Sequence, residues 1–130
     1  MSYMSPEILC PEPSYQGQPA DLFAVAVILF VMRARGVPFK CAMKDDKLFK
    51  LLATRRSDLF WIHHQSHREE GYFSDDFKDL LTAMFEVNAT SRLCIADVIG
   101  HPWMTGEITT KEQVHAEFQR RRLEVETKKP

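Results

Sequence analysis

The sequence predicts an all-α fold, on three observations. Eleven consecutive apolar residues run from Leu22 to Met32 without a turn residue, and a run of this length favours a helix over a strand. Apolar residues between positions 77 and 85 recur at i, i+3, i+4, i+7 and i+8, which is the spacing of one helix face. No segment carries a convincing alternation of polar and apolar residues, so no strand is predicted.

Length and composition fit one globular domain of 130 residues, with 45% hydrophobic and 27% charged residues. A formal net charge of −1 gives no global attraction to nucleic acid or to an anionic membrane. The apolar run at 22–32 is also too short to span a bilayer. Cys10, Cys41 and Cys94 are odd in number and widely spaced, so we expect buried, reduced thiols. With no basic and apolar leader visible, these features predict an intracellular, cytoplasmic protein.

The first part of the chain is predicted to be mostly loop, followed by one long helix. Four prolines and Gly17 fall within residues 1–19, which leaves room for one helical turn after Pro6. The long helix is expected from Ala20 to Met32 and is closed by Gly36 and Pro38. A helix that is apolar on every side is typical of the interior of a larger body.

Three further segments follow in the middle of the chain. Asp45 and Asp46 suit the start of a helix that ends near Arg55 and Arg56, because acidic and basic side chains favour opposite ends of the helix dipole. Residues 60–73 are rich in aromatic residues and histidine without a clean period, so we expect an irregular segment with a short helix at most. Ser74 is a good N-cap for the strongly periodic helix that follows.

The last part of the chain is predicted to hold a turn and two helices. Residues 88–93 form the turn, and residues 95–99 form a short helix that Gly100 and Pro102 end. Thr110 and Gln113 have the spacing of a capping box at the start of the final helix. That helix carries apolar residues on one side and a basic run on the other, namely Val114, Phe118 and Val125, and Arg120–Arg122.

Five motifs, in this order, resemble the C-terminal half of a eukaryotic protein kinase domain. They are YMSPEIL at 3–9, Tyr15-Gln16-Gly17, DLFAVAVILFVM at 21–32, RGVPF at 35–39 and SRLCIADVIGHPWM at 91–104. Several motifs in the right order are far more specific than any single one. The resemblance implies an incomplete kinase C-lobe over residues 1–104, from the end of the activation segment to the last lobe helix, and a C-terminal helical extension over 105–130.

Two details of these motifs indicate the branch of the family. Tyr3 in YMSPEIL resembles the serine/threonine kinases, because tyrosine kinases usually carry tryptophan at this position. The closing His101-Pro102-Trp103-Met104 is similar to the calcium/calmodulin-dependent group. The sequence holds no calcium-binding loop of the EF-hand type, so calcium control is not inferred.

The resemblance also assigns structural roles to particular residues. Ser5-Pro6-Glu7 resembles the family's Ala-Pro-Glu motif, whose glutamate forms a buried ion pair with an arginine, here Arg92. Asp21 resembles the aspartate that opens the central helix and binds the catalytic loop; from its position alone it would be a helix N-cap. Trp103 belongs to the closing motif. The loop that faces the protein substrate is expected to contain Tyr3, Met4 and Ser5.

The residues that transfer phosphate are not found in this sequence. Kinases need a glycine-rich loop, a phosphate-pairing lysine, a catalytic aspartate and metal-binding residues, and the five glycines are never two positions apart. His67-Arg68-Glu69 and Asp76-Phe77-Lys78 look like catalytic motifs but have the wrong residues and order. We therefore expect no catalytic, cofactor-binding or metal-binding residue in this chain. ATP and Mg²⁺ would be bound by the intact domain, which includes the N-terminal half of the kinase. The chain on its own is expected to be inactive.

Two other classes of function remain open. A non-catalytic, pseudokinase-like interaction module would explain an apolar helix with an uncovered flank. A metal site at His63, His64 and His67 is disfavoured, because zinc needs three or four ligands and no further partner is evident. The Arg120–Arg122 run is offset by Glu124 and Glu126, which favours a solvated helix face. The expected partners are therefore proteins, with no nucleic acid and no membrane.

Overall fold

The computed structural model describes residues 1–10 and 16–128 of the chain, and over these it contains helices and no strand. The predicted all-α class is confirmed for the described residues. The loop expected around Pro11 and Pro13, and Tyr15 of the Tyr15-Gln16-Gly17 motif, lie outside them.

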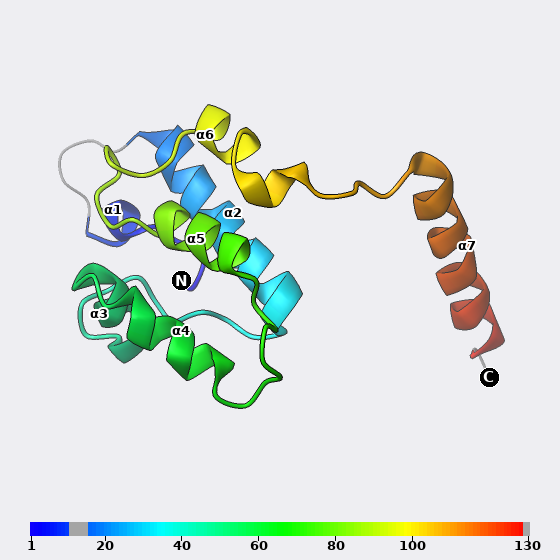
Figure 1. The fold of residues 1–130 in the computed structure, drawn as a ribbon, viewed down its shortest axis with the longest axis horizontal. Helices are drawn as coiled ribbons and strands as arrows, with labels where there is room; N and C mark the ends of the chain where they lie inside the picture. The colour runs from blue at the N-terminus through cyan, green and yellow to red at the C-terminus, as the bar shows by residue number, and fades with distance from the viewer. Residues whose placement is uncertain (11–15, 129–130) are drawn as a thin grey trace.

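A short helix and a long helix open the fold. Helix α1 (Pro6–Leu9) is the single turn expected after Pro6, with this proline at its first position. Helix α2 (Gly17–Ala34) begins three residues before the predicted start and runs past α5 and α6 (Figure 1). Pro19 is tolerated in its first turn because the N–H that proline lacks would have no partner there. Arg35 ends α2 in the left-handed conformation, with φ 56°.

Helix α2 is buried on one side only. Phe23, Val27 and Phe30 are at most 1% exposed, whereas Val25, Ile28 and Met32 are 41%, 46% and 74% exposed. The flank that the sequence predicted to be uncovered is thus open to solvent. We call these three side chains the exposed face of α2.

By length and composition α2 could also cross a membrane, with 18 residues and a mean hydropathy of 1.4. A single helix of this kind is weak evidence, because the core helix of a water-soluble domain meets the same criteria. Its contacts with the aromatic core agree with such a helix.

Helices α3 (Lys47–Ala53), α4 (Ser57–Gln65) and α5 (Asp75–Met84) complete the body. Ser74 caps α5, as the sequence predicts, and Asp46, which was expected near the start of α3, is its N-cap. The segment expected to be irregular with a possible short helix does contain one, since α4 is a regular helix of nine residues that begins before residue 60. Burial of Phe60 and Trp61 against the core stabilises α4 despite the modest helix propensity of aromatic residues.

The core between α2, α4 and α5 is built mainly from aromatic rings. One group surrounds Phe23, whose ring centroid lies 5.5 Å from that of Phe85 and 5.9 Å from that of Phe39. A second surrounds Phe30, which stacks on Phe73 at 5.8 Å. Such pairs contribute about 0.5–1.5 kcal/mol each beyond the area they bury.

The remaining elements are α6 (Ile95–Ile99), the 3₁₀ helix η1 (Pro102–Thr105) and α7 (Lys111–Thr127). Helix α7 begins with the predicted capping box, in which Thr110 and Gln113 bond each other's backbone N–H groups. It contains no buried residue and projects away from the body beyond an extended segment (Figure 1).

The cysteines do not lie where the sequence predicted. Cys10 and Cys94 are exposed and Cys41 is half-buried, so the expectation of buried thiols is wrong. Cys10 follows the last residue of α1, and Cys94 is the N-cap of α6. Both positions are helix ends at the surface. All three thiols are free.

Candidate functional site

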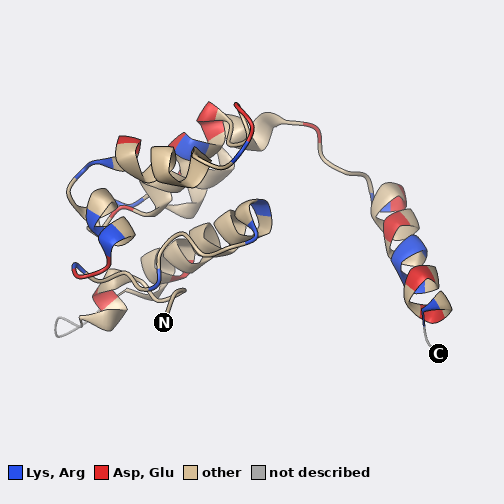
Figure 2. Ribbon diagram, turned by 90° about the horizontal axis from the view of Figure 1, so that it is seen from below, with Lys and Arg blue, Asp and Glu red and all other residues tan. Residues whose placement is uncertain are grey.

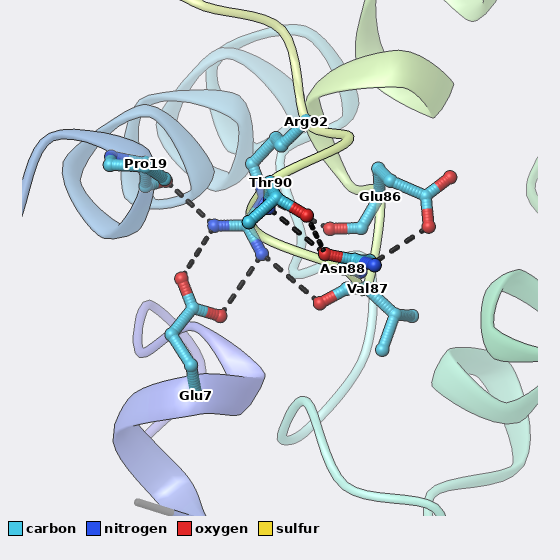
Figure 3. Close-up of polar contacts among 7 residues, drawn as sticks. All are labelled: Glu7, Pro19, Glu86, Val87, Asn88, Thr90 and Arg92. Carbon is cyan, nitrogen blue, oxygen red and sulfur yellow. Dashed lines mark hydrogen bonds and ion pairs between the residues drawn. The ribbon is translucent and has the colours of Figure 1, made fainter. Parts of the chain in front are cut away.

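Arg92 and Glu7 form a bidentate ion pair at the base of the body (Figure 3). The two guanidinium nitrogens Nη1 and Nη2 donate to Oε1 and Oε2 of Glu7 at 2.7 and 3.0 Å. The Arg92 side chain is 0% exposed and that of Glu7 is 17% exposed. The planar guanidinium matches a carboxylate in this geometry, which a lysine cannot do.

The remaining donors of Arg92 bind backbone carbonyl groups from two other parts of the chain (Figure 3). Nη1 donates to the carbonyl oxygen of Pro19 at 2.7 Å, and Nε donates to that of Glu86 at 2.9 Å. The guanidinium carbon also lies 5.0 Å from the centre of the Phe23 ring. One side chain therefore joins α1, the first turn of α2 and the turn after α5.

The turn that carries Arg92 is shaped by side-chain hydrogen bonds. Oδ1 of Asn88 accepts bonds from the backbone N–H and the hydroxyl of Thr90, at 3.0 and 2.6 Å. The carbonyl of Asn88 accepts from the N–H of Arg92 at 3.0 Å. This local bonding defines a turn that contains no proline. Sequence reasoning missed this role, although asparagine in a turn is its usual signal.

The environment of Glu7 favours its charged form. Partial burial alone would raise the pKa of this carboxyl, but the hydrogen bonds and positive charge of Arg92 lower the pKa below its usual value. The carboxylate is therefore ionised near neutral pH, and the pair is charged on both sides.

The loop before α1 presents two side chains to solvent and buries a third. Tyr3 and Met4 are 46% and 44% exposed, whereas Ser5 is 0% exposed. The Ser5 hydroxyl has no hydrogen-bond partner among the described residues. Ser5 was expected in the substrate-facing loop together with Tyr3 and Met4; its side chain is buried at the start of α1, so Tyr3 and Met4 are the exposed residues of this loop.

A second loop lies beside these residues and is organised by Asp46. The hydroxyl of Ser2 donates to the carbonyl of Lys40 at 2.8 Å, which brings the two loops together. One oxygen of Asp46 accepts from the backbone N–H of Lys40 and Cys41, and the other caps α3. Burial would raise the pKa of Asp46, but these backbone bonds lower it below its usual value. The sequence indicated only that Asp46 lies near the start of a helix.

Asp21 and Trp103 lie away from the ion pair. Asp21 is an exposed residue inside α2, whose N-cap is Gln16, so the interpretation of Asp21 as an N-cap is wrong. No hydrogen bond between its carboxylate and another described residue is present. Trp103 lies in η1 and packs on Phe77 with ring centroids 5.7 Å apart. Next to it, His101 accepts the N–H of Trp103 and contacts Asp79.

In the histidine-rich segment at 63–67, a hydrogen bond and ring packing hold His64 in place. Nε2 of His64 lies 2.9 Å from the carbonyl oxygen of Pro38 and therefore carries the proton that it donates. The His64 ring packs edge-on against Phe30 and Phe60, and burial lowers its pKa to about 4. Arg68 donates to the carbonyl groups of His64 and Ala34. Across residues 1–10 and 16–128, no three Cys, His, Asp or Glu side chains meet as a metal site requires.

Residues 1–104 match the model of the protein kinase domain. The chain is 30% identical over 102 residues to the CBL-interacting serine/threonine-protein kinase 13 of Arabidopsis thaliana, which covers 78% of this chain and 18% of that protein. It is 29% identical over 106 residues to the mitosis inducer protein kinase cdr1 of Schizosaccharomyces pombe, covering 82% and 16%.

The match to the CaM kinase-like vesicle-associated protein of Xenopus laevis is 26% identical over 117 residues, and it covers 86% of this chain and 29% of that protein. The chain thus spans less than a third of the length of these relatives.

Proposed function

This chain belongs to the protein kinase family, and we propose that it is the helical, substrate-side part of a serine/threonine kinase. An intact kinase domain transfers the γ-phosphoryl group of ATP to a protein hydroxyl with the help of Mg²⁺. In this proposal a further segment of the protein supplies every residue that binds ATP or Mg²⁺. The 130-residue chain alone transfers no phosphate.

The junction of Glu7 and Arg92 is the observation that carries the proposal. It fixes the start of α1 against the base of the body through two bonds of 2.7 and 3.0 Å. Tyr3 and Met4, just before α1, are therefore held at the surface beside the loop at 40–46. A surface loop held on a rigid support is suited to contact an extended protein substrate.

The residues present do not fit MgATP. The sequence has no G-x-G-x-x-G loop, and in the motif Asp76-Phe77-Lys78 the phenylalanine is buried inside α5. His67-Arg68-Glu69 follows α4, with Arg68 bonded to backbone carbonyl groups. These features support a chain that contributes protein contacts and no nucleotide site.

Nucleotide binding by the purified chain tests this proposal. Isothermal titration with MgATP should give no saturable binding, while a kinase with an intact glycine loop binds under the same conditions. Saturation at micromolar MgATP would contradict the proposal. An antibody to residues 111–128 should also detect a cellular protein much larger than 15.1 kDa. A band at that mass would favour the alternative below.

A non-catalytic interaction module is the alternative, and the exposed face of α2 favours it. Val25, Ile28 and Met32 form a solvent-exposed apolar surface that a partner protein would cover. Sequencing the complete transcript separates the two functions, because only the first requires the glycine loop, lysine and catalytic aspartate in the same protein. We propose an intracellular location for either, which the three free cysteines support.

A further inference from the structure

Helix α7 leaves apolar side chains without cover. Val114, Phe118 and Val125 are 42%, 68% and 61% exposed. With Arg121 they occupy positions i, i+4, i+7 and i+11, which is a single stripe along the helix. Acidic and basic residues occupy much of the remaining surface of α7 (Figure 2), and one further apolar side chain, Leu123, is 62% exposed on the opposite side. One isolated helix cannot bury such a stripe by itself, so α7 needs a surface to pack on.

The body offers a groove between α4 and α5. It has a volume of about 730 Å³ and is lined by one face of each helix. Trp61 lies in it, 8% exposed, with its indole N–H donating to the hydroxyl of Thr82 at 2.8 Å. Ile62 also lines the groove and is 63% exposed. The groove therefore combines an ordered aromatic floor with an apolar side chain that faces solvent.

Three carboxylates line the groove, those of Asp58, Asp75 and Asp79, beside a single lysine, Lys78. Each carboxylate has a partner: Arg56 at 3.1 Å, Lys78 at 3.0 Å and His101 at 2.9 Å, respectively. The three carboxylates are 58%, 100% and 80% exposed, and exposed pairs of this kind exchange readily. An occupant that places a cation beside apolar side chains would match this combination.

The stripe on α7 has this chemistry. It places Arg121 between Phe118 and Val125. Arg121 is paired within α7 to Glu117, but its side chain is 68% exposed, and exposed pairs of this kind contribute little and exchange readily. From 114 to 125 the stripe is about 16 Å long, and the face of α4 from 57 to 65 is about 12 Å long, at 1.5 Å per residue.

We propose that this chain forms a reciprocal dimer, in which α7 of each copy lies in the α4–α5 groove of the other copy. The extended segment after η1 carries α7 outward, where it is placed to reach another molecule (Figure 1). A reciprocal exchange forms the same contact twice, as two-fold dimers do.

Sedimentation velocity of the full chain, from about 1 to 100 μM, tests the proposal. The chain should form a dimer whose fraction rises with concentration. Ile62→Asp in the groove and Phe118→Asp on α7 should each weaken the dimer about tenfold or more, because each places a charge in the contact. Ile99→Asp is the matched control: Ile99 is 64% exposed on α6, outside the groove, and its replacement should leave the dimer unchanged.

Two results would overturn the proposal. A chain that is monomeric throughout this range excludes a second copy, including the case in which α7 folds into its own groove. A dimer that persists in Ile62→Asp or in Phe118→Asp uses another surface, such as the exposed face of α2. Circular dichroism verifies that the variants keep their helices. MgATP binding by the chain would contradict the proposed function and leave this inference standing.

Discussion

Replacing Arg92 by methionine removes the one side chain that joins three parts of the body. Methionine is similar in length and flexible, so it fills much of the same space without the guanidinium. The substitution leaves the carboxylate of Glu7, which is 17% exposed, without its partner. It also leaves the carbonyl groups of Pro19 and Glu86 without the donors they bind.

The expected loss of stability is about 3–5 kcal/mol, the usual cost of removing one member of a buried pair. The upper part of this range applies because Arg92 is 0% exposed and also binds two carbonyl groups outside the pair. Arg92→Lys should fall between the native chain and Arg92→Met. It keeps the charge but cannot form both bonds to Glu7 and reach the carbonyl groups as well.

Urea unfolding followed by far-ultraviolet circular dichroism measures this loss as a lower midpoint with an unchanged slope. Arg120→Met on α7 is the control. Arg120 also binds carboxylates, those of Glu117 and Glu124, but its side chain is 57% exposed. The control should therefore leave the urea midpoint nearly unchanged.

A double-mutant cycle with Glu7→Gln separates the pair from the carbonyl bonds. Each single change strands a partner, so the double variant should lose less stability than the sum of the two. A loss below about 1 kcal/mol for Arg92→Met, or strict additivity in the cycle, would refute the reasoning.

Three other substitutions or conditions test the structure further. Ser5→Ala should raise the free energy of unfolding by about 1 kcal/mol in the same urea assay, because it removes a buried hydroxyl that has no partner among the described residues. Folding lowers the pKa of His64 from 6.5 to about 4, so as the pH falls the imidazole is protonated in the unfolded chain before it is protonated in the folded one. The free energy of unfolding should therefore decrease as the pH falls from 6.5 to about 4. The expected drop, about 1–2 kcal/mol after discounting for partial exposure, should be absent in His64→Gln, which can still donate to Pro38. Arg55→Gly should raise the melting temperature, since Arg55 has φ 59° and glycine adopts this conformation without strain; an unchanged or lower value would contradict it.

The elements that the sequence predicted well are those with local signals. Helix α5 has a serine cap and five apolar residues on one face, and both signals act within the helix itself. The capping box at Thr110 and Gln113 is equally local. For α4 the sequence indicated only a possible short helix, because the stability of α4 depends on Phe60 and Trp61 packing against residues far away in the chain.

The ion pair of the site was predictable only through the family resemblance. Glu7 and Arg92 are 85 positions apart, and no periodicity of the sequence connects them. The burial of Ser5 was not predictable, since serine is a surface residue in most contexts. The start of α2 was set three residues late because a proline at position 19 looked like a loop signal, whereas the first turn of a helix accepts it.

The separation of Glu7 and Arg92 along the chain affects the order of folding. Synthesis proceeds from the N-terminus, so Glu7 is made 85 residues before its partner Arg92. The entropy lost on closing so long a loop grows only slowly with its length, so the late closure is not much more costly than an early one. Helix α1 can therefore dock on the body only after Arg92 has been made, and until then α1 is open to chaperones and proteases.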